Sequence, residues 1–361
     1  MSKMRYYLPT FYSFIILVCV MIVPGSIVHA EANTSSEVAE IVKQYPHNLQ
    51  KENSVELANQ FLTTLTTEQK DKALVPVSKA TLQKWSNLPV NEFKRQGVML
   101  QELSKESLEA ALRLAESALS KDGFKTMKEI ILADDYQFTV SGNTKWGSQQ
   151  YYIAILGNPT MSTHWMLQIT GHHLTENSSF HKGKLESVTP QFTGIEPDTF
   201  TRTGITYSPL KTRRDSMYKM IHSLHKKQLA DAEIKSGPDD VVVIPQNSHS
   251  YPKQEGIPFY ALTIEQQGLV ESAIKAWIND ANSEAYLPAY LDKQALKKTY
   301  IGWSGSTQTG KKPNYIRIDG PRLWIEFASK EGAMSTDNLH YHTVWRDKQT
   351  DYGTLLQPNS R

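Results

Sequence analysis

Cysteine is almost absent from this chain of 361 residues, and the single copy is Cys19, near the N-terminus. If the segment that holds Cys19 is removed, the remaining chain has no thiol. That absence excludes disulfides, thiolate zinc sites, iron–sulfur clusters and cysteine nucleophiles. A chain of this length can bury a sufficient core without disulfides.

Long apolar runs are also missing. The run from Phe11 to Val23 is shorter than the about 20 residues of a membrane-spanning helix. Lys3 and Arg5 precede it and Val28-His29-Ala30 follows it, which is the pattern of a secretion signal. We therefore expect cleavage after Ala30, no membrane span afterwards, and export to the periplasm or the outside of the cell. An uncleaved anchor is the alternative.

An excess of positive charge is absent as well. The sequence has 39 Lys and Arg against 37 Asp and Glu, and two of the basic residues, Lys3 and Arg5, lie in the expected signal. The exported chain is therefore formally neutral. Since affinity for a phosphate backbone depends on a basic surface, nucleic acid is excluded as an expected partner.

Three common motifs are missing or broken. The segment 305–312 approaches a phosphate-binding loop, but Lys312 stands where the motif needs Ser or Thr, and Pro313 follows where a helix should open. We expect no nucleotide cofactor. Neither a Gly-x-Ser-x-Gly elbow nor a His-Glu-x-x-His helix is present, so two frequent kinds of hydrolase are not indicated.

Periodicity predicts an α+β fold, with a helical N-terminal part packed on a mainly antiparallel β-sheet. Residues 1–30 are the expected signal peptide, 31–40 a flexible leader and 41–361 a single domain. Ser104 and a Thr263–Gln266 capping box predict helix starts. The helices are expected at 104–121, from 123 to about 135, at about 208–235 and at 264–281. The strands are expected at 151–156, 164–170, 185–188, 315–318, 323–327 and 339–345.

Several sequence blocks, in order, resemble one family over essentially the whole exported chain. They are Gly171-His172-His173-Leu174, Pro190-Gln191-Phe192-Thr193-Gly194-Ile195-Glu196-Pro197, Tyr315-Ile316-Arg317-Ile318-Asp319-Gly320-Pro321 and the block from His340 to Gly353. These blocks identify the chain as similar to the domain-of-unknown-function family numbered 3500. The resemblance implies one domain of this kind and supplies no activity.

A pair of histidines is the strongest candidate for chemistry. On a strand, His340 and His342 project from one face, so both imidazoles can bind one metal ion, zinc or copper. Arg346 continues that face and is a candidate for orienting an anionic substrate. Two half-exposed histidines that only hydrogen bond are the alternative.

A third metal ligand is expected from His172 or His173. Neighbours on a strand face opposite ways, so one of the two should reach a site on a single face, unless the strand ends at Gly171. We keep both residues as metal candidates. We also expect the 172 and 340 blocks to meet in space, within about 12 Å, because a metal needs donors from several elements.

Carboxylates nearby have candidate roles in the same site. Glu326 lies in an apolar run and is expected to be a general base, a metal ligand or the partner of Arg317. Asp347 and Asp351 are candidates for holding an imidazole in position, and their alternative role is to cap a turn.

Two classes of function remain open from the sequence. In the first, an exported metal-dependent enzyme, a hydrolase by default, uses these histidines with Glu326 and Arg346 as catalytic residues. In the second, the protein binds a small molecule or glycan without catalysis, with tryptophans such as Trp165, Trp303, Trp324 and Trp345 as stacking platforms.

Overall fold

The computed structural model describes residues 36–47, 52–245, 251–281 and 286–355, which belong to one compact unit. The expected signal peptide and its cleavage site after Ala30 lie outside the described residues. Helix α1 (Glu37–Gln44) begins inside the range expected to be a flexible leader, because the Ser36 side chain caps it by accepting from the Ala39 amide. Among the described residues, none of the helices combines the length and the apolar character that a membrane span requires.

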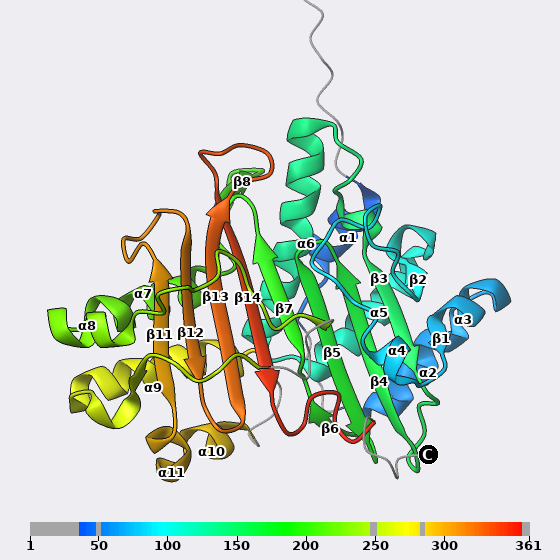
Figure 1. Ribbon diagram of the computed structural model, residues 1–361. Helices are drawn as coiled ribbons and strands as arrows, with labels where there is room; N and C mark the ends of the chain where they lie inside the picture. Colours follow the sequence, from blue (N-terminus) through cyan, green and yellow to red (C-terminus); the bar gives the residue numbers. More distant parts are fainter. Residues whose placement is uncertain (1–35, 48–51, 246–250, 282–285, 356–361) are drawn as a thin grey trace, which may run out of the picture. The chain divides into compact units, whose positions relative to one another are not determined.

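One large sheet organises the described residues, and its strand order is β1-β3-β4-β5-β7-β14-β13-β12-β11-β10, with β2 beside β3 and β6 beside β5 (Figure 1). Only the β1–β3 pair is parallel, so the expected α+β class with a mainly antiparallel sheet is confirmed. The strands of this sheet are β1 (Leu74–Val75), β2 (Val98–Met99), β3 (Tyr152–Leu156), β4 (His164–Gly171), β5 (Leu174–His181), β6 (Lys184–Ser187), β7 (Gln191–Ile195), β10 (Ile257–Pro258), β11 (Tyr300–Gly305), β12 (Asn314–Asp319), β13 (Leu323–Glu331) and β14 (Leu339–Asp347). A separate hairpin consists of β8 (Phe200–Arg202) and β9 (Ile205–Tyr207).

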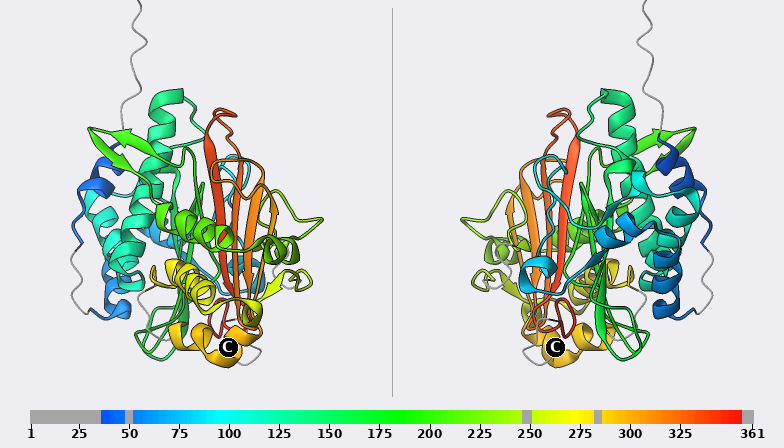
Figure 2. Two further views of the ribbon diagram at one scale, coloured as in Figure 1. Left: turned by 90° about the vertical axis from the view of Figure 1, so that its left-hand side faces the viewer. Right: turned by 90° about the vertical axis from the view of Figure 1, so that its right-hand side faces the viewer.

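Most of the helices cover one side of the sheet (Figure 2). We call this side the helix face; it carries Trp165, Phe327 and Trp345, which belong to the main apolar core together with the helices. The further helices are α2 (Ser54–Thr63), α3 (Thr67–Ala73), α4 (Lys79–Leu82), α5 (Lys105–Ala118), α6 (Lys121–Ser141), α7 (Lys211–His222), α8 (Lys226–Ala232), α9 (Ile264–Ile278), α10 (Tyr286–Leu291) and α11 (Lys293–Lys297).

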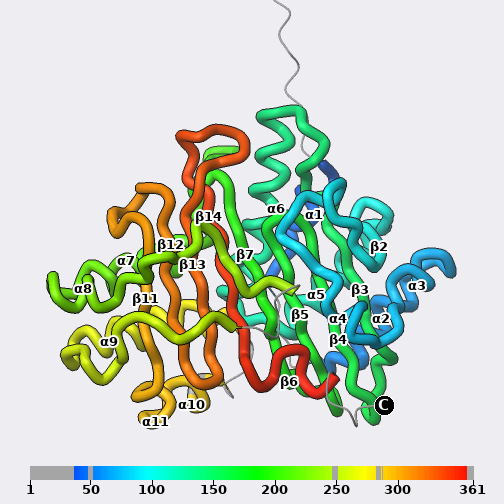
Figure 3. The backbone as a smooth tube through the Cα atoms, viewed as in Figure 1, coloured from blue at the N-terminus to red at the C-terminus, as the bar shows by residue number. Residues whose placement is uncertain are grey.

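Mostly irregular chain, with the short helix α4, covers the other side, which we call the loop face; it carries Phe192, Glu326, His342 and Arg346. In Figure 3 the segments 76–97 and 234–245 run across it. A smaller apolar cluster holds them there, in which Trp85 and Val241 pack with Phe192 and other sheet residues. The loop face is therefore buried, although its strands carry many polar side chains.

Helix starts were predictable from capping residues. Ser104 caps α5, and the Thr263–Gln266 capping box opens α9, as the sequence indicates. Helix α6 is longer than expected: it begins at Lys121 and continues beyond Asp134 to Ser141. The aspartate pair at 134–135 is polar, so the sequence indicated a helix end there. The partners that bury the pair come from distant parts of the chain, which local sequence does not reveal.

The prediction of a single helix at about 208–235 is wrong. Two helices, α7 and α8, replace it, and they are separated at Ser223–His225. His225 takes an extended conformation, with ψ 161°, and starts α8 with a capping box to Gln228. Apolar periodicity cannot detect such a break, because the residues on both sides keep the helical spacing.

The expected strands are confirmed within two residues at their N-terminal ends, while β13 extends beyond its expected C-terminal end. The longer strands β5, β7 and β11 and the short strands β1, β2, β8, β9 and β10 were not expected. Strand β5 carries Glu176, Asn177, Ser178 and Ser179, all buried. A strand in the middle of a sheet normally reads as apolar or alternating, so this sequence gives no strand signal.

Candidate metal centre

The β4–β5 hairpin turn brings His172 and His173 to the end of the sheet. Gly171 pairs with Leu174, so the two histidines form the two-residue turn. His173 adopts a left-handed conformation, with φ +60°, which histidine tolerates better than most residues. The Gly194 amide donates to the His173 carbonyl at 2.7 Å and fixes the turn against β7. The strand parity therefore breaks at Gly171, which was the alternative that the sequence left open.

The turn meets the start of β14. His173 Nε2 lies 2.8 Å from His340 Nε2, so the expected meeting of the two sequence blocks is confirmed. The His173 ring centroid is 5.4 Å from that of His342, which projects from the same strand face as His340. We call His173, His340 and His342 the histidine centre; one nitrogen from each lies within 4.8 Å of the others. All three are buried, with exposed fractions of 1%, 6% and 3%.

Each Nδ1 atom of the histidine centre faces an oxygen. His342 Nδ1 lies 2.8 Å from Asp240 Oδ1, and His340 Nδ1 lies 3.2 Å from the Glu331 carbonyl. His173 Nδ1 faces Asp134 Oδ1 at the longer distance of 3.9 Å. Such outer oxygens hold a ring with its hydrogen on Nδ1 and the lone pair on Nε2. The Nε2 atoms are the ones left to bind something else.

One of these Nε2 atoms has no partner. His342 Nε2 is buried and forms no hydrogen bond to any protein atom in the described part of the chain. Buried polar atoms are nearly always bonded, so an orphan of this kind needs an explanation. A metal ion bound between the three rings supplies one, and the His/Asp groups here could hold such an ion.

Burial favours the neutral form of two of these imidazoles, His173 and His340. Desolvation, with repulsion from neighbouring histidines, lowers the pKa of His340 to about 2 and puts the pKa of His173 well below its usual value. A metal ion binds only the neutral ring. His173 and His340 are therefore in the protonation state that metal binding needs.

Gly194 sets how closely the rings approach. It pairs with His342 across β7 and β14. A Cβ atom added at Gly194 would lie 2.8 Å from His173 Cδ2 and 3.0 Å from His342 Cδ2. Any side chain here would push the two rings apart. Glycine is thus required by close packing at this position.

His172 lies beside the histidine centre and is held by α6. Its ring stacks on His173 with centroids 3.6 Å apart, and its Nδ1 lies 3.0 Å from Asp134 Oδ1. The Tyr151 hydroxyl donates to the other Asp134 oxygen at 2.9 Å. Burial raises the pKa of Asp134, whereas the contact with His172 lowers it. His172, His173 and Asp134 also form a group that could hold a metal ion.

Asp240 joins the histidine centre to the surface. Lys330 Nζ donates to Asp240 Oδ2 at 2.5 Å. Burial acts to raise the pKa of Asp240, yet His342 and Lys330 hold that pKa below its usual range. A cavity of about 330 Å³ is lined by Asp240, Lys330, Glu331 and Lys312, so it reaches two residues that contact the histidine centre. Reasoning from sequence missed both Asp134 and Asp240.

Glu326 and Arg346, the expected catalytic pair, bind the chain segment that crosses the loop face. Glu326 accepts from the amides of Val242 and Val243 at 2.8 and 3.0 Å, and burial raises its pKa. Arg346 donates to Asp351 at 2.7 Å and to the Val243 carbonyl at 3.1 Å. We call Glu326, Arg346 and Asp351 the anchor group.

Asp347 and Asp351, expected to hold an imidazole, have other partners. Asp351 is paired with Arg346 and also accepts from the Asp347 amide at 3.0 Å. The Asp347 carboxylate accepts from Tyr290 at 2.7 Å and from Arg322 at 2.6 Å. Both also contact the turn that follows β14, which was their alternative role. Among the described residues, the carboxylates beside these histidines come instead from Asp134, Asp240 and Glu196, whose Oε2 lies 3.7 Å from His340 Nδ1.

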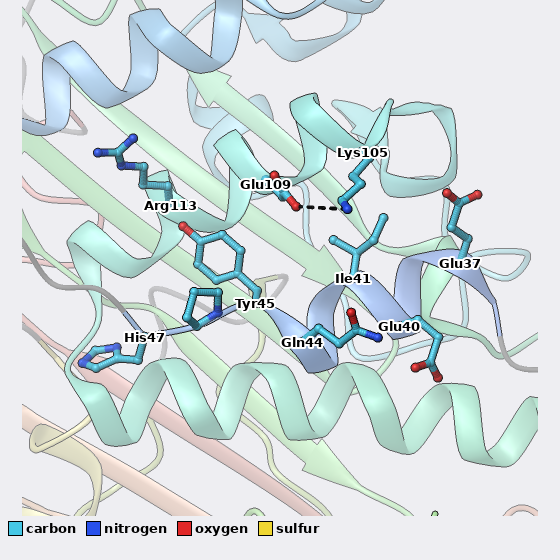
Figure 4. Close-up of a pocket in the computed structure, with 10 residues that line it drawn as sticks. Glu37, Glu40, Ile41, Gln44, Tyr45, His47, Lys105, Glu109 and Arg113 are labelled. Atoms are coloured by element: carbon cyan, nitrogen blue, oxygen red, sulfur yellow. Dashed lines mark ion pairs between the residues drawn. The ribbon is translucent and has the colours of Figure 1, made fainter.

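A larger pocket is formed by other residues. It has a volume of about 950 Å³ and lies between α1 and α5 (Figure 4). Its lining includes Tyr45, Arg113 and the ion pair of Lys105 with Glu109, whose atoms are 3.9 Å apart. None of the histidine centre lines it. We therefore base the functional argument on the histidine centre.

Comparison with known proteins places the chain in a family. A family model described as "Protein of unknown function (DUF3500)" matches residues 47–354. The chain belongs to this family. No curated protein and no solved structure matches it. The matched range of the DUF3500 domain contains the histidine centre, Asp134, Asp240 and the anchor group.

Proposed function

We propose that this DUF3500 protein is a metal-dependent enzyme that works outside the cytoplasm, with zinc or copper bound by His173, His340 and His342. Hydrolysis is its default reaction. The support for export is the signal pattern ahead of Glu31. The support for a metal is the arrangement of the six ring nitrogens of the histidine centre.

That arrangement carries the proposal. Each Nδ1 faces an oxygen and His173 Nε2 lies against His340 Nε2, while the buried His342 Nε2 has no hydrogen-bond partner in the described part of the chain. Two nitrogens of a tetrahedral zinc site lie about 3.3 Å apart when each is about 2.05 Å from the metal. The 2.8 Å between His173 Nε2 and His340 Nε2 needs to widen by only about half an ångström.

Three protein ligands favour a catalytic ion over a structural one. Structural zinc sites use four protein ligands, whereas catalytic sites keep a position for water or substrate. A metal ion at such a position lowers the pKa of its bound water and supplies hydroxide at neutral pH. His172 is stacked on His173 and fixed by Asp134, which makes it our candidate to orient that water or accept its proton.

The neighbouring cavity suggests the kind of substrate. Its volume of about 330 Å³ is at the small end of ligand sites, and Asp239, Asp240, Lys312 and Lys330 line it. We infer a small polar substrate that carries hydrogen-bonding groups. A large apolar molecule would bury these charges without partners.

The alternative, a non-catalytic binder with tryptophan platforms, finds less support. Trp165, Trp324 and Trp345 are fully buried and pack in the protein interior. Trp303 is half-buried, and its indole donates to the Leu229 carbonyl at 2.9 Å. A stacking platform for a glycan must be exposed.

Metal analysis of protein purified without an affinity tag, after brief chelator dialysis, tests this function. We expect the wild type and the control His222→Ala to hold one equivalent of zinc or copper at the histidine centre. We expect His340→Ala and His342→Ala to hold one equivalent fewer than the wild type and to lose less than about 3 kcal/mol in stability, because the core does not depend on the metal.

Activity completes the test. A panel of ester, amide, phosphoester and glycoside substrates should reveal hydrolysis that chelator removes and added metal restores. Metal content that is unchanged in both histidine variants would contradict the metal assignment. Stoichiometric metal without hydrolysis of any substrate class would contradict the enzyme and leave a metal-dependent binder.

A further inference from the structure

We propose a second metal site at the opposite end of the β4–β5 hairpin, formed by His164, His181 and Glu186 and suited to Zn²⁺ or Cu²⁺. It is independent of the proposed function. His164 lies eight residues before His172 on the chain, which in an extended strand is roughly 25 Å. The two sites therefore cannot share an ion.

Strand pairing brings the two histidines together. His164, at the start of β4, pairs directly with His181, at the end of β5. Their rings stack with centroids 3.8 Å apart and an interplanar angle of 21°. The Nδ1 atom of each ring faces the same carboxylate, that of Glu186, so both Nδ1 atoms lie on one side of the stacked pair.

A bulge supplies the carboxylate. The β5–β6 register shifts, because Phe180 pairs with Leu185 while Ser179 pairs with Ser187. Glu186 is the extra residue between them, and a bulge of this kind redirects a side chain. Glu186 Oε2 lies 3.0 Å from His164 Nδ1, and Glu186 Oε1 lies 3.6 Å from His181 Nδ1.

The C-terminal turn closes the group. Thr354 Oγ1 lies 2.7 Å from His164 Nδ1 and 3.3 Å from Glu186 Oε2. Gly353, at φ +61°, lets this turn approach: a Cβ there would lie 2.9 Å from the Ser179 side chain. An ion bound by the two strands would therefore also contact the segment that carries Thr354.

The ligand set fits a borderline divalent ion. Two imidazoles and one carboxylate are typical ligands of zinc and copper(II), and one potential ligand atom from each of the three residues lies within 4.8 Å of the others. The side chains are each 23–24% exposed, so ions and water reach them from solvent. Binding requires each ring to carry its hydrogen on Nε2, and Glu186 then moves from hydrogen-bond acceptor to metal ligand.

A pair of structural histidines that share one carboxylate would have the same contacts, so the test must count ions. Zn²⁺ is titrated into the metal-free full-length protein by calorimetry, and the wild type is compared with His181→Ala, Glu186→Gln and the control His222→Ala. We expect the first two variants to bind one equivalent fewer than the wild type and the control to bind the same number.

His340→Ala separates this site from the histidine centre. If both assignments hold, His340→Ala and His181→Ala each lose one equivalent, and the double variant loses two. Loss of an equivalent in His340→Ala alone would overturn the second site and leave the proposed function standing. Loss of an equivalent in His181→Ala alone would overturn the metal assignment at the histidine centre and leave the second site standing.

A further measurement covers variants that fold poorly. Cu²⁺ added to chelator-treated His342→Ala should give an electron paramagnetic resonance spectrum with two coupled imidazole nitrogens, because His164 and His181 remain. A spectrum of hydrated or nonspecifically bound Cu²⁺ would overturn the second site. Glu186→Gln keeps the shape of the side chain, so its loss of Zn²⁺ would not reflect lost packing.

Discussion

The histidine centre and the anchor group lie on the same sheet face, and both consist of buried polar side chains. In the anchor group, both oxygens of Glu326 accept hydrogen bonds and Arg346 binds Asp351 and the chain segment above it. In the histidine centre, His342 Nε2 has no protein partner among the described residues, and His173 Nε2 faces His340 Nε2. The difference is that the histidine centre has hydrogen-bonding capacity on its ring nitrogens that the protein itself does not use.

This difference distinguishes a structural group from the candidate metal site, which burial alone does not. Glu326 and Arg346 have the residue types of a catalytic pair, yet their hydrogen bonds fix the segment 241–243 to the sheet. The three histidines are held by outer oxygens so that their remaining nitrogens converge. Variants of the anchor group should therefore lower stability and leave metal content unchanged. Variants of the histidine centre should lower metal content and change stability less.

The largest expected effect on stability is at Arg346. Replacing it by Ala leaves Asp351 buried without its charge partner, which costs about 3–5 kcal/mol. Chemical denaturation measures this loss. Metal content per folded molecule should remain at the wild-type value, and a variant that loses metal but keeps its stability would break the comparison.

Gly194→Ala should affect both properties. The added Cβ separates His173 from His342, so we expect a stability loss of about 1–3 kcal/mol, as for overpacking, together with loss of bound metal. Gly268→Ala is the matched control: its Cβ meets nothing within 4 Å, and alanine favours a helix by up to about 1 kcal/mol. Melting curves and metal analysis of both variants check this. Full metal content in Gly194→Ala would show that close ring packing is unnecessary.

Glu176 on the helix face extends the comparison to pH. Burial raises its pKa to about 8, and Gln191 is its hydrogen-bond donor. In the unfolded chain the pKa returns to about 4.3, so between these values the unfolded state releases a proton that the folded state keeps. Stability should fall by about 1.4 kcal/mol per pH unit as pH rises from about 5 to 8.

Glu176→Gln should remove this component. Denaturation curves of the variant and the wild type are expected to agree near pH 4 and to diverge as pH rises, with the variant more stable at pH 8. Parallel curves at all pH values would show that Glu176 ionises normally in the folded protein.

The smallest stability effect is expected at Asp240. Asp240→Asn keeps a hydrogen-bond acceptor for His342 but removes the negative charge, so metal affinity should fall about 10–100-fold while the melting temperature changes little. Competition with a chelator of known affinity measures the change. Unaltered affinity would remove Asp240 from the description of the site.

Much of the site was predictable from local patterns. The spacing of His340 and His342 on a strand placed both rings on one face, and Gly171 signalled where the strand parity could break. The sequence could not choose between His172 and His173, because the choice depends on the left-handed conformation of His173 at the turn.

The outer partners were not predictable, for two physical reasons. Asp134 lies inside α6. Its polarity indicated a helix end, because the sequence does not show the tertiary contacts with His172 and Tyr151. Asp240 lies in irregular chain with no periodicity, and its position depends on the anchor group. Strand β5 was not predicted because its buried side chains are polar. They hydrogen bond to the neighbouring strand, as Asn177 does by accepting from Gln168 at 2.9 Å.

X-ray diffraction at the zinc and copper absorption edges, from crystals of metal-loaded wild-type protein, tests the metal assignment most directly. We expect an anomalous peak about 2.0–2.1 Å from the Nε2 atoms of His173, His340 and His342, with a water molecule in the fourth position. A map without a peak there, in crystals that retain the 2.8 Å contact between His173 and His340, would contradict it.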